Sequence, residues 1–256
     1  MAVKKTVEQI LDENPCIRDV EVHDSRRSIK SYVLRTSKLS KTEEEAIGLY
    51  YKDYGVGYRA ELVDPADLFE VKRPVIIEIG FGDGEPTFQI AQSRPQYNYL
   101  GLEVYLNGFC SLLDKVGKTG LDNVKMMRFD AAEVLSTMIE PGSVDGFHIF
   151  FPDPWPKRKH QKRRLLNEDF ARTLASRLKE GGYIYFVTDW QDYANQALEV
   201  LEHTQDLANE YDGFAPSMPW RPLTRFERKG LVQDFPISEL WFVKKSQSFG
   251  IVKPEH

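Results

Sequence analysis

Between residues 73 and 202 the sequence alternates short apolar runs with longer segments of helical character, and this alternation restricts the fold to a few classes. The apolar runs predict strands at residues 75–80, 97–103, 124–129, 144–151 and 183–188, with a last strand at residues 239–243. Helices are predicted at residues 86–93, 106–117, 131–138, 170–178 and 192–202. Strands that alternate with helices form a parallel sheet with helices on both faces. We therefore expect an α/β fold with a mostly parallel, doubly wound sheet.

The segments on either side of this unit carry weaker signals. Residues 1–25 are polar and lack a clear period, so we expect a mobile or loosely docked tail. Residues 26–72 are expected to form an N-terminal extension that packs on or near the main domain. Within it we predict a helix that begins after Ser40 and a loop at residues 50–58. The main domain is placed at residues 73–245 and a C-terminal tail at residues 246–256.

Composition excludes several classes of protein. A hydrophobic content of 41% with 29% charged residues is typical of a soluble globular protein, and no apolar run approaches the roughly 18 residues of a membrane span. The charged N-terminus lacks an apolar signal region, and Cys16 and Cys110 lack metal-ligand spacing, so we expect free thiols in a reducing cytoplasm. The net charge of -5 argues against a general basic coat but leaves room for a local basic patch.

Three glycines follow the first predicted strand. Gly80, Gly82 and Gly84 permit a tight turn that a ligand can approach closely. Glu103 lies 19 residues beyond Gly84, at the end of the next strand, where an acid can accept hydrogen bonds from ribose hydroxyls. This spacing fits NAD and S-adenosylmethionine about equally.

Two further acids favour S-adenosylmethionine. Glu78 lies inside the first strand, where a carboxylate can face the ammonium or sulfonium end of a ligand, and Asp130 closes the third strand, where it can accept from an adenine amino group. A dinucleotide needs donors for its pyrophosphate, whereas a cationic ligand suits acids. One such acid is commonly a solvated carboxylate, but three at successive strands indicate a cofactor site. A NAD-dependent oxidoreductase remains an alternative.

The fourth strand runs into a rigid turn and a basic segment. Asp153 lies between Pro152 and Pro154, each of which fixes φ and restricts the residue before it, so its carboxylate can be aimed at a ligand. Residues 157–164 hold six Lys and Arg among eight residues, which indicates contact with nucleic-acid phosphates. Trp155 either stacks on a base or covers the core. His160 has no partner at metal-ligand spacing, so no metal is expected.

The motifs in this order resemble one family closely. They are Glu78-Ile79-Gly80-Phe81-Gly82-Asp83-Gly84, Gly101-Leu102-Glu103-Val104, Phe150-Phe151-Pro152-Asp153-Pro154-Trp155, Thr188-Asp189-Trp190 and Arg221-Pro222-Leu223-Thr224-Arg225-Phe226-Glu227. The chain resembles the bacterial tRNA (guanine-N7-)-methyltransferases from about Arg26 to Phe242. It departs from them at Pro156, where family members commonly have His, and in the acidic continuation Asp83-Gly84-Glu85-Pro86.

The resemblance implies a Rossmann-like class I methyltransferase that uses S-adenosylmethionine to methylate N7 of a guanosine in the tRNA variable loop. Carried over residue by residue, Glu78, Glu103, Asp130 and Asp153 match the family's cofactor-site acids, with Asp153 also its proposed catalytic residue. Its substrate-site positions are Lys157, Asp189, Thr224, Arg225, Phe226 and Glu227, and its RNA-contact segment is Lys159, His160, Gln161, Lys162, Arg163 and Arg164.

We therefore expect tRNA as the partner, no membrane association, a cytoplasmic location and a monomer or homodimer. Two further alternatives remain at this point. The first is a class I methyltransferase that acts on another RNA, a small molecule or a protein; with a small molecule or a protein as substrate it would not need the basic segment. The second is a tRNA-binding protein with a vestigial cofactor site, which the intact acids disfavour.

Overall fold

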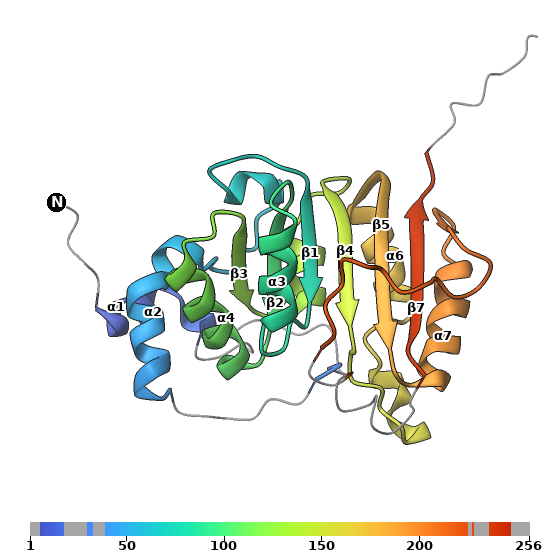
Figure 1. The fold of residues 1–256 in the computed structure, drawn as a ribbon, viewed down its shortest axis with the longest axis horizontal. Helices are drawn as coiled ribbons and strands as arrows, with labels where there is room; N and C mark the ends of the chain where they lie inside the picture. Colours follow the sequence, from blue (N-terminus) through green and yellow to red (C-terminus); the bar gives the residue numbers. More distant parts are fainter. Residues whose placement is uncertain (1–5, 18–29, 33–38, 225–226, 228–235, 247–256) are drawn as a thin grey trace, which may run out of the picture.

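A seven-stranded sheet forms the centre of the computed structural model, which describes residues 6–17, 30–32, 39–224, 227 and 236–246 (Figure 1). The strands are β1 Val75–Ile79, β2 Asn98–Glu103, β3 Val124–Arg128, β4 Val144–Phe150, β5 Leu178–Thr188, β6 Leu207–Asn209 and β7 Ser238–Lys244. Their order in the sheet is β3-β2-β1-β4-β5-β7-β6. The first five strands pair in parallel, and β7 lies antiparallel between β5 and β6. The expected mostly parallel sheet is confirmed.

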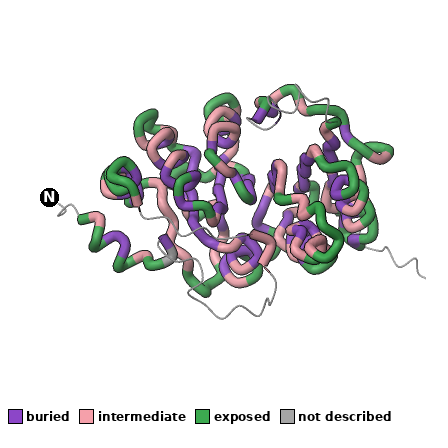
Figure 2. The backbone as a smooth tube through the Cα atoms, turned by 90° about the horizontal axis from the view of Figure 1, so that it is seen from below, coloured by how far each residue is buried: buried purple, intermediate pink, exposed green. Residues whose placement is uncertain are grey.

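Helices cover the sheet on both sides because its strands are apolar on both faces. The helices are α1 Val7–Glu13, α2 Lys41–Tyr54, α3 Glu85–Ser93, α4 Leu106–Thr119, α5 Ala131–Thr137, α6 Glu168–Arg177 and α7 Gln191–Glu202. Short 3-10 helices are η1 Pro15–Ile17, η2 Pro65–Leu68 and η3 Arg158–Arg163. Helices α5, α6 and α7 contribute to one apolar core, and α1 to α4 contribute to a second. Buried positions follow the strands between these layers (Figure 2).

The direction in which successive strands are added to the sheet reverses between β1 and β4. From β1 the sheet extends outward through β2 and β3, and β4 then returns to pair with the opposite edge of β1. In open α/β sheets, ligands bind outside the carboxyl ends of the strands at such a switch point. The fold therefore predicts a site where β1 and β4 end.

Local boundaries differ from the sequence-based expectation in three places. The loop expected at residues 50–58 begins later, because α2 continues to Tyr54 and buries Tyr51 against Phe109 with 6.2 Å between ring centroids. Strand β5 begins at Leu178, which pairs with Val144, so Gly181 and Gly182 lie inside a strand instead of ending a helix. The short β6 has no apolar alternation long enough to be recognised from the sequence.

The N-terminal segment is better ordered than its composition indicated. Thr6 caps α1 in a capping box with Gln9, and Ile10 and Leu11 are buried in the core shared with α2. Ile17 is also buried, and its carbonyl accepts a hydrogen bond from Arg128 Nη1. Of the mobile or loosely docked tail expected at residues 1–25, residues 6–17 are thus docked on the domain; residues 1–5 and 18–25 lie outside the described part of the chain.

Replacing Leu11 with Ala tests this docking. Leu11 is 3% exposed, so the substitution leaves a cavity and should lower the free energy of unfolding by about 2 kcal/mol or more. Chemical denaturation measures the change, and Asp12→Ala on the exposed face of the same helix is the matched control. Equal stability of the two variants would show that α1 does not contribute to the core.

Candidate active site

A cavity of about 590 Å³ lies at the carboxyl ends of the central strands. Its size falls in the range of about 300–1,000 Å³ that is usual for ligand sites. The lining includes Ile79 and Gly80 after β1, Glu103 to Tyr105 after β2, Phe129 to Ala131 after β3, Phe151 to Asp153 after β4, and Ser31, Tyr32 and Leu165. Four residues predicted from the sequence therefore line one cavity: Gly80, Glu103, Asp130 and Asp153.

The glycine turn requires glycine for its backbone conformation and its packing. Gly80, Gly82 and Gly84 have φ of 76°, 58° and 72°, which side chains of L-residues disfavour. A Cβ atom on Gly84 would also lie 2.6 Å from the Leu112 side chain, and one on Gly108 would lie 1.9 Å from the Gly82 carbonyl oxygen. Helix α4 thus packs directly behind the turn. Gly108 was missed by sequence reasoning, although a glycine inside a predicted helix is a signal of close packing.

Glu103 joins the glycine turn to the loop after β2. Its Oε2 accepts from the Gly82 N–H at 2.7 Å, and its Oε1 accepts from the N–H groups of Val104 and Tyr105 at 2.7 and 2.9 Å. Burial raises the pKa of this carboxyl, and the three backbone donors oppose the rise. Because a carboxylate oxygen has about two acceptor positions, Oε2 can accept one further donor from the cavity.

Glu78 lies beneath the glycine turn and is 2% exposed. Among the described residues its Oε2 has no hydrogen-bond partner, and the buried Thr87 hydroxyl of α3 has none either. Burial raises the pKa of Glu78 to about 8, the nearby Thr87 hydroxyl opposes the rise, and the Glu103 carboxylate adds to it. A buried carboxylate oxygen without a partner is costly unless a ligand satisfies it. This environment fits a cationic group bound above the turn. No pattern in the sequence indicated that Thr87 would lie near the site.

Asp130 has two tasks at the end of β3. It is the N-cap of α5, and its Oδ1 accepts from the Ala132 N–H at 2.9 Å. The residue also lines the cavity, where its second carboxylate oxygen is available to a ligand donor. The hydrogen bond from the Ala132 N–H at the start of α5 fixes the position of the carboxylate.

Asp153 lines the cavity from a strained turn, and the residue is exposed to solvent. Phe151 and Trp155 on either side of the Pro-Asp-Pro turn have φ of 49° and 44°, a conformation that is costly for residues with a Cβ atom. The turn persists because the Phe151 N–H donates to the Val187 carbonyl at 2.8 Å and Arg164 Nε donates to the Pro154 carbonyl at 2.9 Å. The walls of the cavity partly desolvate Asp153 and raise its pKa, while the positive charge of Arg163 opposes the rise.

Two arginines of the basic segment are engaged inside the protein. Arg164 is 2% exposed, and besides Pro154 it binds Gln196 and Asp192, each at 2.5 Å. The expected RNA contact of Arg164 is corrected accordingly, because its guanidinium is enclosed between the turn and α7. Arg163 stacks on Trp155 at 3.9 Å from the ring centroid. Trp155 therefore supports an arginine with its ring, and its stacking on a base stays a prediction.

Arg163 and Trp155 also hold residues 30–32, which precede the main domain, at the cavity. Arg163 donates to the carbonyls of Lys30 and Tyr32 at 3.0 and 2.7 Å, and Trp155 Nε1 donates to the Ser31 carbonyl at 3.0 Å. Ser31 and Tyr32 in turn line the cavity. The exposed cations of the segment are Lys157, Arg158, Lys159 and Lys162, whereas His160 and Gln161 are half-buried.

The other predicted substrate residues lie outside the cavity lining. Asp189 follows β5 and is half-buried. Thr224 and Glu227 are buried and bind each other, and Glu227 also binds Arg221. Arg225 and Phe226 are outside the described residues. Cys110 is a free, buried thiol whose pKa burial raises to about 12, while the side chain of Cys16 is outside the described part of the chain.

The strand order, the antiparallel β7 and the acid-lined cavity at the switch point define a Rossmann-like class I methyltransferase. The same fold occurs in the 16S rRNA methyltransferase KamB, with a TM-score of 0.51 and 14% identity over 85% of this chain and 99% of that one. A family described as putative methyltransferases (Methyltransf_4) matches residues 72–240. No helix in the described ranges is both long and apolar enough to span a membrane.

Sequence relatives narrow this class. The tRNA (guanine-N(7)-)-methyltransferase of Nitrosospira multiformis is 45% identical over 87% of this chain and 97% of its own length. The enzyme of the same name from Chromobacterium violaceum is 44% identical over 86% of this chain and 97% of its own length. The chain belongs to the tRNA (guanine-N(7)-)-methyltransferase family.

Stability should depend on pH through Glu78. The folded protein keeps the Glu78 proton up to about pH 8, whereas the unfolded chain releases it near the ordinary value of 4.5. Between these values the folded state binds more protons, so stability falls as pH rises. Glu78→Gln should flatten this fall in the ligand-free protein, measured by thermal unfolding from pH 5 to pH 8. Glu45→Gln, at an exposed position of α2, is the control. An unchanged slope in Glu78→Gln would mean that Glu78 is ionised across this range.

Proposed function

We propose that this protein transfers a methyl group from S-adenosylmethionine to N7 of a guanosine in the tRNA variable loop. The observation that supports this most directly is the group of acids around one cavity, with a buried carboxylate oxygen of Glu78 that lacks a partner among the described residues. Such a site favours a cation over a dinucleotide pyrophosphate. The names of the sequence relatives support the choice of substrate.

Different residues at the cavity would bind different parts of the proposed cofactor. Glu103 would accept from the ribose hydroxyls with Oε2, and Asp130 from the adenine amino group. The turn at Gly80 lets the backbone approach the ligand closely, and Glu78 below it would stabilise the positive end of the ligand. When bound, S-adenosylmethionine supplies an electrophilic methyl group on a positively charged sulfur.

Guanine N7 carries an in-plane lone pair and no proton, so the reaction needs no strong general base. The bond from N7 to the methyl carbon forms as the bond from carbon to sulfur breaks, and the positive charge passes to the guanine. The task of the protein is to hold N7 and the methyl group in line at near-attack distance. Asp153, which lines the cavity from its strained turn, would accept from guanine N–H groups and stabilise the developing cation.

The basic segment would position the tRNA by its phosphates. The exposed side chains of Lys157, Arg158, Lys159 and Lys162 extend from η3 and the turn before it, beside the segment that carries Asp153. Arg163 would contribute indirectly, by holding residues 30–32 at the cavity. Lys157 and Asp189 remain candidates for contact with the guanine.

Replacing Asp153 with Ala should lower kcat for methyl transfer to unmodified tRNA by about 100-fold or more, because an oriented charge is lost from the transition state. Binding of S-adenosylmethionine should survive with reduced affinity. The assay measures transfer of labelled methyl groups and maps the product nucleotide by primer extension after cleavage at N7-methylguanosine. Asp153→Asn, which keeps the shape and one acceptor, should retain more activity. Full turnover by Asp153→Ala would rule out the proposed role.

Replacing Lys157, Lys159 and Lys162 with Ala should raise the KM for tRNA and leave the affinity for S-adenosylmethionine unchanged. If each lysine binds one phosphate, the slope of log K against log salt concentration should fall by about 2–3. Removal of three exposed lysines elsewhere, Lys52, Lys72 and Lys118, is the control for net charge. The same tRNA affinity and salt slope in both triple variants would contradict the proposed contact.

A further inference from the structure

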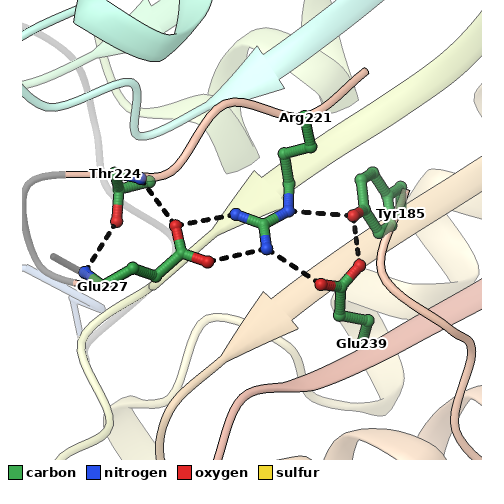
Figure 3. A network of polar contacts seen from close by, with 5 residues as sticks. All are labelled: Tyr185, Arg221, Thr224, Glu227 and Glu239. Carbon is green, nitrogen blue, oxygen red and sulfur yellow. Dashed lines mark hydrogen bonds and ion pairs between the residues drawn. The ribbon is translucent and has the colours of Figure 1, made fainter. Parts of the chain in front are cut away.

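A buried ion-pair network joins the chain after β6 to the sheet (Figure 3). Arg221 forms a bidentate pair with Glu227, with Nη1 to Oε2 at 2.8 Å and Nη2 to Oε1 at 2.7 Å. Its Nη2 also donates to Glu239 of β7 at 2.8 Å, and its Nε donates to the Tyr185 hydroxyl of β5 at 3.0 Å. The Tyr185 hydroxyl in turn donates to Glu239. One guanidinium therefore ties two strands to a loop segment.

This arrangement is too costly to be incidental. Arg221 is 7% exposed and Glu227 and Glu239 are each 3% exposed, so three charges have been removed from water. Burial lowers the pKa of the Arg221 guanidinium, but the hydrogen bonds to Glu227 and the charge interactions with Tyr185, Glu239 and Glu227 together outweigh burial, and the pKa is raised. Such networks are retained more for the geometry that they specify than for stability.

The network holds Arg221, Thr224 and Glu227 together. The Thr224 N–H donates to Glu227 Oε2 at 2.6 Å, and the Glu227 N–H donates to Thr224 Oγ1 at 3.1 Å, so the two residues form a reciprocal cap. Both oxygens of Glu227 are thus engaged by Arg221, and one of them also by Thr224. A carboxylate held in this way is poorly placed to turn toward a guanine.

The network also lies beside the turn that carries Asp153. The Arg221 guanidinium is 6.0 Å from the centroid of the Phe151 ring, and Phe151 both lines the cavity and has the strained φ that begins the turn. The segment reaches this place by crossing the sheet: Trp220 contacts His148 of β4 and Tyr185 of β5, and Ala215 bridges to Glu239 of β7. Figure 1 shows this crossing in orange and red.

We propose that Arg221 is a positioning residue for methyl transfer, which holds Glu227, Thr224 and the base of the Asp153 turn in place, and that Glu227 acts through this ion pair instead of reading the guanine. The inference rests on the proposed function and refines the part assigned there to Glu227. Arg221 lies outside the cavity lining, so its effect on the reaction would pass through the Phe151 ring and through Glu227 to Thr224.

A double-mutant cycle in the full-length protein tests this assignment. Arg221→Lys keeps the charge but loses the planar fork, and Glu227→Gln keeps the shape but loses the charge. Each should lower kcat on tRNA by about 10–100-fold with a smaller change in the KM for tRNA, and the double variant should be no slower than the slower single variant. If Glu227 read the guanine directly, Arg221→Lys would keep a kcat near that of the unsubstituted protein and the two effects would multiply. That result would overturn the proposal.

Two further variants keep the test decisive if a charge substitution unfolds the protein. Tyr185→Phe removes one hydroxyl from the network and keeps the ring, so the protein should fold and show the same fall in kcat at a smaller size. Arg172→Met breaks an exposed ion pair on α6 and is the matched control, with no expected change. Equal kcat in Tyr185→Phe and Arg172→Met would count against the network.

Amide hydrogen exchange separates this inference from the proposed function. The amides of Thr224 and Glu227 should lose protection in Arg221→Lys and Tyr185→Phe, a readout that does not depend on methyl transfer. Unchanged protection would overturn the inference even if tRNA is methylated. If the two variants lose protection but the unsubstituted protein does not methylate tRNA, the proposed function is refuted instead, and with it the catalytic role of the network.

Discussion

The site depends on the pairing of β1 with β2 on one side and with β4 on the other. Parallel pairing makes all of these strands end at the same edge of the sheet, and the reversal at β1 leaves an opening there that side chains do not fill. Glu103, Asp130 and Asp153 are separated by more than twenty residues along the chain, yet each follows a strand and lines the same cavity. Without this parallel pairing the three acids would not line the same cavity.

The electrostatics of the cavity favour a positively charged ligand. Glu78 and Glu103 are both buried, and burial raises the pKa of each. Three backbone N–H groups donate to Glu103 and oppose the rise in its pKa, whereas Glu78 Oε2 has no donor in the part of the chain that the structure describes. A cation bound above the turn would stabilise the ionised form of Glu78. The same field would favour the positive charge that a guanine gains when its N7 is alkylated.

Arginines organise the site as much as they attract RNA. Arg163 holds residues 30–32 at the cavity, Arg164 fixes the end of the Asp153 turn, and Arg221 joins the loop after β6 to β5 and β7. In each case the planar guanidinium binds several oxygens at once, which a lysine cannot do. The lysines of the basic segment are exposed and free to meet phosphates. Within residues 157–164, Arg163 and Arg164 therefore support the site, whereas the three lysines and Arg158 are exposed.

Much of the fold and part of the site followed from the sequence. The alternation of apolar runs and helices determined a mostly parallel sheet, and because parallel strands end at one edge, it also determined that Gly80, Glu103, Asp130 and Asp153 would meet. The sequence did not reveal that α1 docks, since two buried side chains in a polar segment give no period. It could not tell the buried Arg164 from the exposed Lys162, because the reach of a long side chain depends on which elements pack around it. Only the tertiary structure decided that Arg221 meets Tyr185 and Glu239 as well as Glu227, since Tyr185 and Glu239 come from β5 and β7, which lie far from Arg221 in the chain.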